Sequence, residues 1–186
     1  LTTSLFQEDD GKTILMGSVI DITERKNAEL NLIYQTYHDP LTGLYNRRYF
    51  EEHRSDFDNP NNYPLSITLI SINGLPLFNE VFGFKVGDEV MLKGAELLKQ
   101  GVHQDDLLYR MDGDKFMILH PKQTVSEANK MIRSYREAFS KISVENIVLS
   151  ISCGHASKNK AHVEIEKLLT IASDNLKRDK LTDKSS

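Results

Sequence analysis

The chain has no tryptophan, one cysteine and five prolines among its 186 residues. Its single cysteine, Cys153, cannot form an internal disulfide, so the fold does not depend on one. Cys153 lies in the apolar run 147–154, where we expect a buried small hydrophobe and not a nucleophile. No stretch approaches the roughly 18 apolar residues that a membrane span requires, and no signal-peptide pattern is present. We therefore expect a cytoplasmic domain without a membrane segment, although a longer parent chain can still carry an anchor.

An excess of basic residues is also absent. Lysine and arginine number 23 against 27 aspartate and glutamate residues, which gives a formal net charge of -4 and an isoelectric point near 5.9. Nucleic-acid-binding surfaces normally appear as a basic excess, so no nucleic-acid partner is expected. The six histidines show no metal-ligand spacing, and we assign no zinc site. At this length the chain can hold one full domain and an appendage.

The N-terminal segment has the pattern of the end of a larger domain. Residues 1–6 and 13–20 are rich in β-forming residues and flank an acidic turn, which predicts a two-stranded hairpin. Two strands alone cannot bury a core, so the hairpin should belong to something larger. From Thr23 the pattern becomes helical, because Thr23 can cap a helix and residues 25–37 contain neither glycine nor proline. This stretch predicts a connector helix.

Helices and strands alternate through the rest of the chain. Pro40 ends the connector, and Asn46 is expected to cap the next helix. The further elements that the pattern predicts are a central strand at 65–72, a loop at 83–87 leading into a helix at 88–100, a hairpin over 107–119, a helix at 125–142, a strand at 146–152 and a helix from 163 to about 180. This order predicts an α+β fold with helices on one face of a mostly antiparallel sheet.

The hairpin over residues 107–119 is the most informative of these elements. Its two apolar runs are joined through Asp112 and Gly113, and an Asp-Gly pair supplies the positive φ angles of a type I′ turn. Asp114 and Lys115 are then expected at the tip, facing solvent or a cleft. Taken alone, such a turn is an ordinary hairpin.

Three segments in this order and spacing carry a family resemblance. They are Asp-Pro-Leu-Thr-Gly-Leu-Tyr-Asn-Arg-Arg at 39–48, Asn-Glu-Val-Phe-Gly-Phe-Lys-Val-Gly-Asp at 79–88 and Arg-Met-Asp-Gly-Asp-Lys-Phe at 110–116. From residue 39 onward the chain resembles the GGDEF family of diguanylate cyclases, which join two GTP molecules into cyclic di-GMP. The resemblance implies a ferredoxin-like palm, with a central, mostly antiparallel sheet flanked by helices.

A second resemblance concerns the N-terminal segment. Residues 17–26 resemble the closing strand and exit sequence of a PAS sensor domain. Together the two resemblances imply the C-terminal end of a PAS domain at 1–23, a signalling connector helix at 24–38 and a GGDEF-like domain at 39–184. Because the family's reaction and signalling use paired domains, they also imply a homodimeric parent.

The family signature is degenerate where metal would be held. Ser71 stands at the position of a metal-binding aspartate, and a hydroxyl is a poorer Mg²⁺ ligand than a carboxylate. Asp114 matches a carboxylate that binds metal and assists catalysis, but Lys115 replaces a glutamate. The charge of these three positions moves from about -3 to about 0, which removes most of the attraction for Mg²⁺. Pro76 replaces a phosphate-binding lysine.

Several nucleotide-binding positions are retained. Asn79 and Asp88 match the family's guanine-reading pair, since an amide and a carboxylate offer complementary donors and acceptors. Each also has a structural interpretation, because Asn79 can cap a turn and Asp88 can be the N-cap of the helix predicted at 88–100. The other positions that the resemblance assigns to the nucleotide are Gly113, Lys180 and Lys184, with Lys115 as a substitute phosphate ligand. Asp112 replaces a glycine that lies close to the nucleotide, and the family's Arg-x-x-Asp feedback site is absent at 108–111.

Three functions follow from this pattern. We favour a catalytically inactive, regulatory module of a bacterial cyclic di-GMP signalling protein, with GTP or GDP binding and a neighbouring EAL phosphodiesterase domain as open features. The first alternative is an active diguanylate cyclase with altered metal ligands. The second is a dimerisation scaffold that binds no nucleotide. Mg²⁺ is expected as a cofactor only if nucleotide binds in the family's manner.

Overall fold

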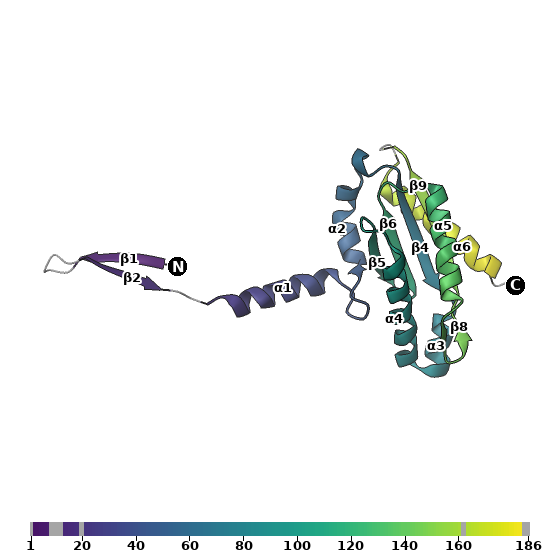
Figure 1. Ribbon diagram of the computed structural model, residues 1–186, viewed down its shortest axis with the longest axis horizontal. Coiled ribbons are helices and arrows are strands. Elements are labelled where there is room, and N and C mark those ends of the chain that lie inside the picture. Colours follow the sequence, from purple (N-terminus) through teal and green to yellow (C-terminus); the bar gives the residue numbers. More distant parts are fainter. Residues whose placement is uncertain (1, 8–12, 19–20, 161–162, 184–186) are drawn as a thin grey trace. The chain divides into compact units, whose positions relative to one another are not determined.

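The computed structural model describes residues 2–7, 13–18, 21–160 and 163–183 (Figure 1). The chain divides into two compact units, Leu1–Thr36 and Tyr37–Ser186. In the first unit, β1 (Thr2–Gln7) pairs antiparallel with β2 (Thr13–Ser18). The predicted N-terminal hairpin is confirmed.

Helix α1 (Thr23–Tyr37) confirms that this stretch is helical. The side chain of Asp21 accepts a hydrogen bond from the backbone N–H of Thr23 at 2.9 Å, so Asp21 makes the capping contact that we expected of Thr23. None of the described residues of α1 is buried. Its large apolar side chains that are more than half exposed are Leu30, Leu32, Ile33 and Tyr34.

The second unit is built on a five-stranded sheet in the order β3-β5-β6-β4-β9. The strands are β3 (Tyr45–Asn46), β4 (Leu65–Ile72), β5 (Leu107–Asp112), β6 (Lys115–His120) and β9 (Ile151–Lys158). β3 runs parallel to β5, and the other pairings are antiparallel. Every residue of β4 is buried, as its apolar run predicts for a central strand. The α+β class with a mostly antiparallel sheet is confirmed.

Helices cover both faces of this sheet (Figure 1). They are α2 (Arg47–Phe57), α3 (Leu75–Phe82), α4 (Phe84–Gly101), α5 (Val125–Phe139) and α6 (Ile165–Asp183), beside a short 3-10 helix at Pro60–Asn62. On one face Ile70 packs in a cluster with Phe139 of α5, and on the other Ile67 packs with Leu168 of α6. The prediction of helices on one face was wrong, because β4 carries apolar side chains on both faces and each needs cover. Among the residues that the structure describes, every helix is too short or too polar to cross a lipid bilayer.

The segment before the helix predicted at 88–100 was also predicted wrongly. Helix α3 was not anticipated, and of the loop expected at 83–87, residues 84–87 form the start of α4. Gly83 alone joins the two helices, with a φ of 86° that glycine adopts without strain. Asp88 consequently lies inside α4 and is not its N-cap.

The last strand lies further along the chain than predicted. We expected it at 146–152, but β9 begins only at Ile151. Glu145 and Asn146 have positive φ angles of 50° and 62° and turn the chain between β7 (Ser143–Val144) and β8 (Ile147–Val148). The first part of the apolar run therefore belongs to this small hairpin.

The middle of β9 is filled by two small residues. Cys153 is buried as predicted, and burial raises the pKa of its thiol to about 12, so it stays protonated at neutral pH. A Cβ on the next residue, Gly154, would lie 2.1 Å from the backbone nitrogen of Leu176. Only glycine allows α6 to lie this close to the strand.

Four tyrosines gather where the second unit begins. Tyr45 and Tyr49 stack with their ring centroids 4.1 Å apart, and Tyr37 meets Tyr49 at 5.5 Å. Tyr109 of β5 lies 5.9 Å from Tyr45. Asn46 caps α2 as predicted, because its side chain accepts the backbone N–H of Tyr49 at 3.0 Å. This tyrosine cluster packs β3 and α2 against β5.

Candidate nucleotide site

The end of β4, the β5–β6 turn and helix α6 meet at one group of side chains. Ser71 of β4 is fully buried, and its hydroxyl donates a hydrogen bond to Oδ2 of Asp114 in the turn. From α6, Nζ of Lys180 lies 3.0 Å from the same oxygen. The sheet fixes this arrangement, because Ser71 lies opposite Lys115 and the N–H of Ile72 donates to the carbonyl of Asp114 at 3.0 Å.

These contacts hold Asp114 as a carboxylate. Partial burial by itself raises the pKa of Asp114. Hydrogen bonds from Ser71 and Lys180, with the charges of Lys180 and Lys115, outweigh that effect and leave the pKa below its usual value. Nζ of Lys115 lies 3.9 Å from Oδ1 of Asp114 and 3.3 Å from Oδ2 of Asp112. The two ammonium groups therefore balance the two carboxylates.

A cavity of about 430 Å³ lies beside this group of side chains. Its lining residues are Ile72, Asn73, Gly74, Pro76, Leu77, Asp114 and Lys180. Pro76 lies in the first turn of α3, where it offers neither a charge nor a backbone donor. The amide of Asn73 is engaged, since it donates to Ser150 at 3.1 Å and accepts from Ser152 at 2.9 Å. Among the described residues that line the cavity, the α3 side therefore offers no cation for a phosphate.

The two residues predicted to contact guanine lie on neighbouring helices, Asn79 on α3 and Asp88 on α4. A Cβ added to Gly87 would lie 1.8 Å from Oδ1 of Asn79, so the Asn79 side chain occupies the space that a larger residue at 87 would need. Asp88 is exposed. Neither residue lines the 430 Å³ cavity, although Asn79 follows Pro76 by three positions and shares its side of α3.

Arg110 fastens the hairpin turn, a role that the sequence did not suggest. Its guanidinium lies 2.9 and 3.1 Å from the two carboxylate oxygens of Asp39 and donates to the carbonyl of Gly113 at 3.1 Å. The hairpin is confirmed, but its type I′ turn is not, because Gly113 lies outside the left-handed region. A register shift between Arg110 and Asp112 bends the strand before the turn and accounts for the difference.

The protein-family model described as "Diguanylate cyclase, GGDEF domain" matches residues 36–186 of this chain. The chain belongs to the GGDEF family. Diguanylate cyclase DgcM of Escherichia coli (strain K12) is 29% identical to it over 176 residues, which cover 91% of this chain and 43% of that protein. Diguanylate cyclase DosC of Shigella sonnei (strain Ss046) is 30% identical over 146 residues, which cover 74% of this chain and 32% of that protein. The chain thus spans less than half the length of these relatives.

Solved structures share the GGDEF fold of this chain. The coiled coil and GGDEF domain of DgcB from Caulobacter crescentus, in complex with c-di-GMP, superposes with a TM-score of 0.77 at 19% identity and covers 86% of this chain and 88% of that one. The S helix-GGDEF-EAL structure of LapD from Vibrio cholerae, bound to c-di-GMP, gives a TM-score of 0.77 at 19% identity, over 88% of this chain and 39% of that one. At these identities the likeness is one of fold.

Mg²⁺ does not fit the remaining carboxylate of this GGDEF domain. The ion needs octahedral oxygen ligands and is normally held by one or two carboxylates. Oδ2 of Asp114 already accepts hydrogen bonds from Ser71 and Lys180, and Oδ1 faces the ammonium of Lys115. Within the ranges 21–160 and 163–183, no group of three or more acidic, histidine or cysteine side chains is placed to hold a metal.

The GGDEF domain brings together only some of the predicted site residues. Asp114 and Lys180 share the cavity, with Ser71 directly behind Asp114. Lys115 and Gly113 lie in the same hairpin but do not line that cavity. Lys184 lies outside the described residues. The pairing of Lys180 with Asp114 was not predicted, because no local pattern signals a contact between residues 66 positions apart.

Proposed function

We propose that this chain is a regulatory GGDEF domain of a cyclic di-GMP signalling protein and that it does not join GTP molecules. The observation that carries the proposal is the closed cluster of Ser71, Asp114 and Lys180. In this cluster the hydroxyl of Ser71 stands where a metal-binding carboxylate is expected, and the ammonium group of Lys180 lies against Asp114 where a metal ion would bind.

The chemistry of phosphoryl transfer explains why this cluster matters. The protein's part in such a reaction is chiefly to position the phosphates and to neutralise the charge that develops on them, usually through Mg²⁺. Asp114 offers a single carboxylate whose charge Lys180 and Lys115 already offset. Without a metal ion, the attacking ribose hydroxyl has no Lewis acid to stabilise its oxyanion.

A product assay tests the proposal. Purified protein incubated with GTP and either Mg²⁺ or Mn²⁺ should form no cyclic di-GMP above background by mass spectrometry. Steady product formation that Asp114→Ala abolishes would establish the alternative, a working cyclase with altered metal ligands. The Asp114→Ala control separates the chain's own activity from that of a contaminating cyclase.

Metal-free binding of GTP or GDP is the second part of the proposal. The ammonium groups of Lys180 and Lys115 lie at or beside the cavity, where they can meet phosphate oxygens after parting from Asp114 and Asp112. Asn79, on the same side of α3 as Pro76, is within the region where a guanine would then lie. Because the lysines must first leave their carboxylates, binding should be weak.

Calorimetric titration of GTP with and without EDTA tests this second part. Wild-type protein should bind equally in both conditions, and added salt should weaken binding through screening. Lys115→Glu should lose affinity, whereas Lys177→Glu, the same change on an exposed face of α6, should not. Strict dependence on metal would contradict the proposal, and undetectable binding would leave the domain as a dimerisation scaffold.

The chain's other segments fit a place inside a longer signalling protein. We assign residues 1–23 to the end of a PAS domain, 24–38 to a signalling connector and 39–184 to the GGDEF domain, in the cytoplasm where GTP is available. An EAL phosphodiesterase domain is a suitable neighbour, since LapD has the order S helix-GGDEF-EAL. The exposed apolar side chains of α1 support a homodimeric parent. A monomeric mass for the full-length parent would contradict the dimer.

A further inference from the structure

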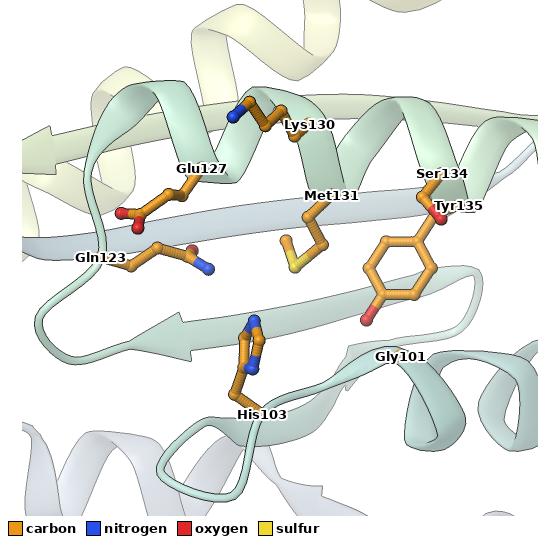
Figure 2. A pocket seen from close by; sticks show the side chains of 8 residues that line it. All are labelled: Gly101, His103, Gln123, Glu127, Lys130, Met131, Ser134 and Tyr135. Carbon is orange, nitrogen blue, oxygen red and sulfur yellow. The ribbon is translucent and has the colours of Figure 1, made fainter.

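A second hollow, which shares no lining residue with the cavity beside Asp114, lies between α5 and the loop after α4 (Figure 2). It measures about 350 Å³, which lies at the lower end of the range for small-molecule pockets. Met131 and Tyr135 of α5 form one side, His103 faces them from the loop, and Gln123 closes one end. A neighbouring hollow of about 280 Å³ shares His103, Gln123 and Glu127.

Gln123 is rigidly placed but incompletely bonded. Its backbone N–H donates to the carbonyl of Pro64 at 3.0 Å, and its carbonyl accepts from the hydroxyl of Ser66 at 2.9 Å. The residue is only 7% exposed, and its side-chain Oε1 is buried without a hydrogen-bond partner. The amide points into the hollow (Figure 2). A buried polar atom left unpaired costs about 1–3 kcal/mol, so a ligand in the hollow that gives this amide oxygen a donor would be favoured.

Further unpaired polar atoms lie in strands β4 and β6. Five buried side-chain atoms in the described part of the chain lack a hydrogen bond, and besides Gln123 three of them belong to Thr68 and His120. His120 lies opposite Ser66 in the sheet, and Ser66 bonds to Gln123. Nδ1 of His120 is 3.0 Å from Oδ1 of Asp106, outside hydrogen-bond geometry. Strands β4 and β6 therefore carry further under-bonded polar atoms, although of the unpaired groups among the described residues only Gln123 lines the two hollows.

The rest of the lining favours a hydrogen-bond donor. Carboxylates of Glu127, Asp105 and Asp106 border the two hollows, against ammonium groups of Lys122 and Lys130. In Figure 2 the carboxylate of Glu127 lies at the Gln123 end of the hollow, where its Oε2 accepts hydrogen bonds from the N–H and hydroxyl of Thr124, while the chain of Lys130 turns away from His103. Hydrogen bonds from Thr124 lower the pKa of Glu127, so it is charged at neutral pH. Acceptors thus dominate the polar end.

The apolar end favours a flat ring. The ring of Tyr135 rests on Gly101, where a Cβ would come within 2.4 Å of it, and its hydroxyl donates to the carbonyl of Leu98 at 3.3 Å. Met131 contributes an adaptable thioether, and the imidazole of His103 faces it across the hollow (Figure 2). Aromatic and thioether groups facing each other make a slot for a planar molecule.

We infer that this hollow binds a small flat ring carrying an N–H donor group, such as an amidine or an amino-substituted nitrogen heterocycle. The ring enters between His103 and Met131. Its donor group meets the amide oxygen of Gln123, which a half turn of the amide brings to the cavity side, and the carboxylate of Glu127. The site is separate from the cavity beside Asp114, so it holds whether or not the domain binds GTP.

Three ligands of the same shape test the inference. Benzamidine, benzamide and benzoate present donors, both donors and acceptors, or acceptors, and at neutral pH they are a cation, a neutral molecule and an anion. In titrations of the full chain followed by amide NMR, we expect benzamidine to bind about tenfold more tightly than benzoate, with benzamide between them, as one gained or lost polar contact can give. Shifts should gather at 101–103 and 123–135. An equal or reversed order, or scattered shifts, would overturn the proposal.

Matched substitutions provide the second arm of this experiment. Gln123→Leu should weaken benzamidine binding about tenfold, and Met131→Trp should abolish it by filling the hollow. Gln104→Leu, the same exchange on an exposed neighbour outside both hollows, should change nothing. Because Gln123→Leu removes an unpaired buried acceptor, the free protein should be as stable as wild type or more so. Loss of stability without loss of binding would show that Gln123 is purely structural.

Discussion

Exchanging Ser71 for aspartate and Lys115 for glutamate should turn the closed cluster at Asp114 into one that depends on metal. In the wild type the Ser71 hydroxyl donates to Asp114, and Nζ of Lys115 lies 3.9 Å from that carboxylate. The double variant S71D/K115E places three carboxylates there, and the charge of the three positions falls from about 0 to about -3. Lys180 alone then remains to offset it.

The expected cost follows from the distances. Two like charges about 4 Å apart repel by about 4 kcal/mol at an effective dielectric constant of 20, and loss of the hydrogen bond to a charged group adds about 1.5–3 kcal/mol. The Asp114 side chain is 24% exposed, so solvent screening reduces the sum, and we expect a net loss of about 4 kcal/mol. Without metal, the melting temperature should fall by about 8–16 °C for a domain of this size.

Dye-based thermal melts in EDTA and in Mg²⁺ measure this effect. Mg²⁺ at about one hundred times its dissociation constant should return about 2.7 kcal/mol to the double variant and leave the wild type unchanged. A control, S126D/K177E, carries the same charge change on exposed positions of α5 and α6 and should not respond to Mg²⁺. Stabilisation of the wild type by Mg²⁺, or indifference of S71D/K115E to it, would refute the reasoning.

Three further predictions concern stability. Gly154→Ala should cost about 1–3 kcal/mol through the clash with α6, whereas Gly113→Ala, where a Cβ meets nothing within 4 Å, should be nearly neutral in urea unfolding. Asp58→Asn should cost about 3–5 kcal/mol by the same assay, because it leaves the ammonium of Lys158, 1% exposed, without its charged partner. The pKa of Asp114 is lowered in the folded state, so its carboxylate stabilises the protein above the unfolded-state pKa of about 3.9 and stabilises it less as the pH falls below that value. The difference in unfolding free energy between wild type and Asp114→Asn should therefore shrink between pH 6 and about pH 3.

The sequence predicted those parts of the fold whose signals are local. The continuous apolar run of β4 and the cap at Asn46 were identified because neighbouring residues alone determine them. Helix α3 was missed because Pro76 and Gly83, which usually interrupt helices, here stand at its first turn and just beyond its end. The displacement of β9 has the opposite origin, since nothing in the apolar run 147–154 marks the end of β8 at Val148 and the start of β9 at Ile151.

The candidate site was predicted in its members but not in its contacts. Asp114 and Ser71 were identified from the family motifs, and the sheet register then placed them together. The ion pair between Lys180 and Asp114 depends on how α6 lies across β9. The ion pair between Arg110 and Asp39 joins the first and the last of the three family segments. Such long-range contacts between side chains leave no period or spacing in the sequence.

The tyrosine cluster has a spectroscopic consequence. The chain has seven tyrosines and no tryptophan, so tyrosine alone determines its ultraviolet emission. Tyr37, Tyr45, Tyr49 and Tyr109 lie within a few ångströms of one another, close enough to exchange excitation energy. Four of the seven emitting rings therefore report on the place where α1 ends and the second unit begins. A change of conformation at that place can be recorded optically on the unlabelled chain.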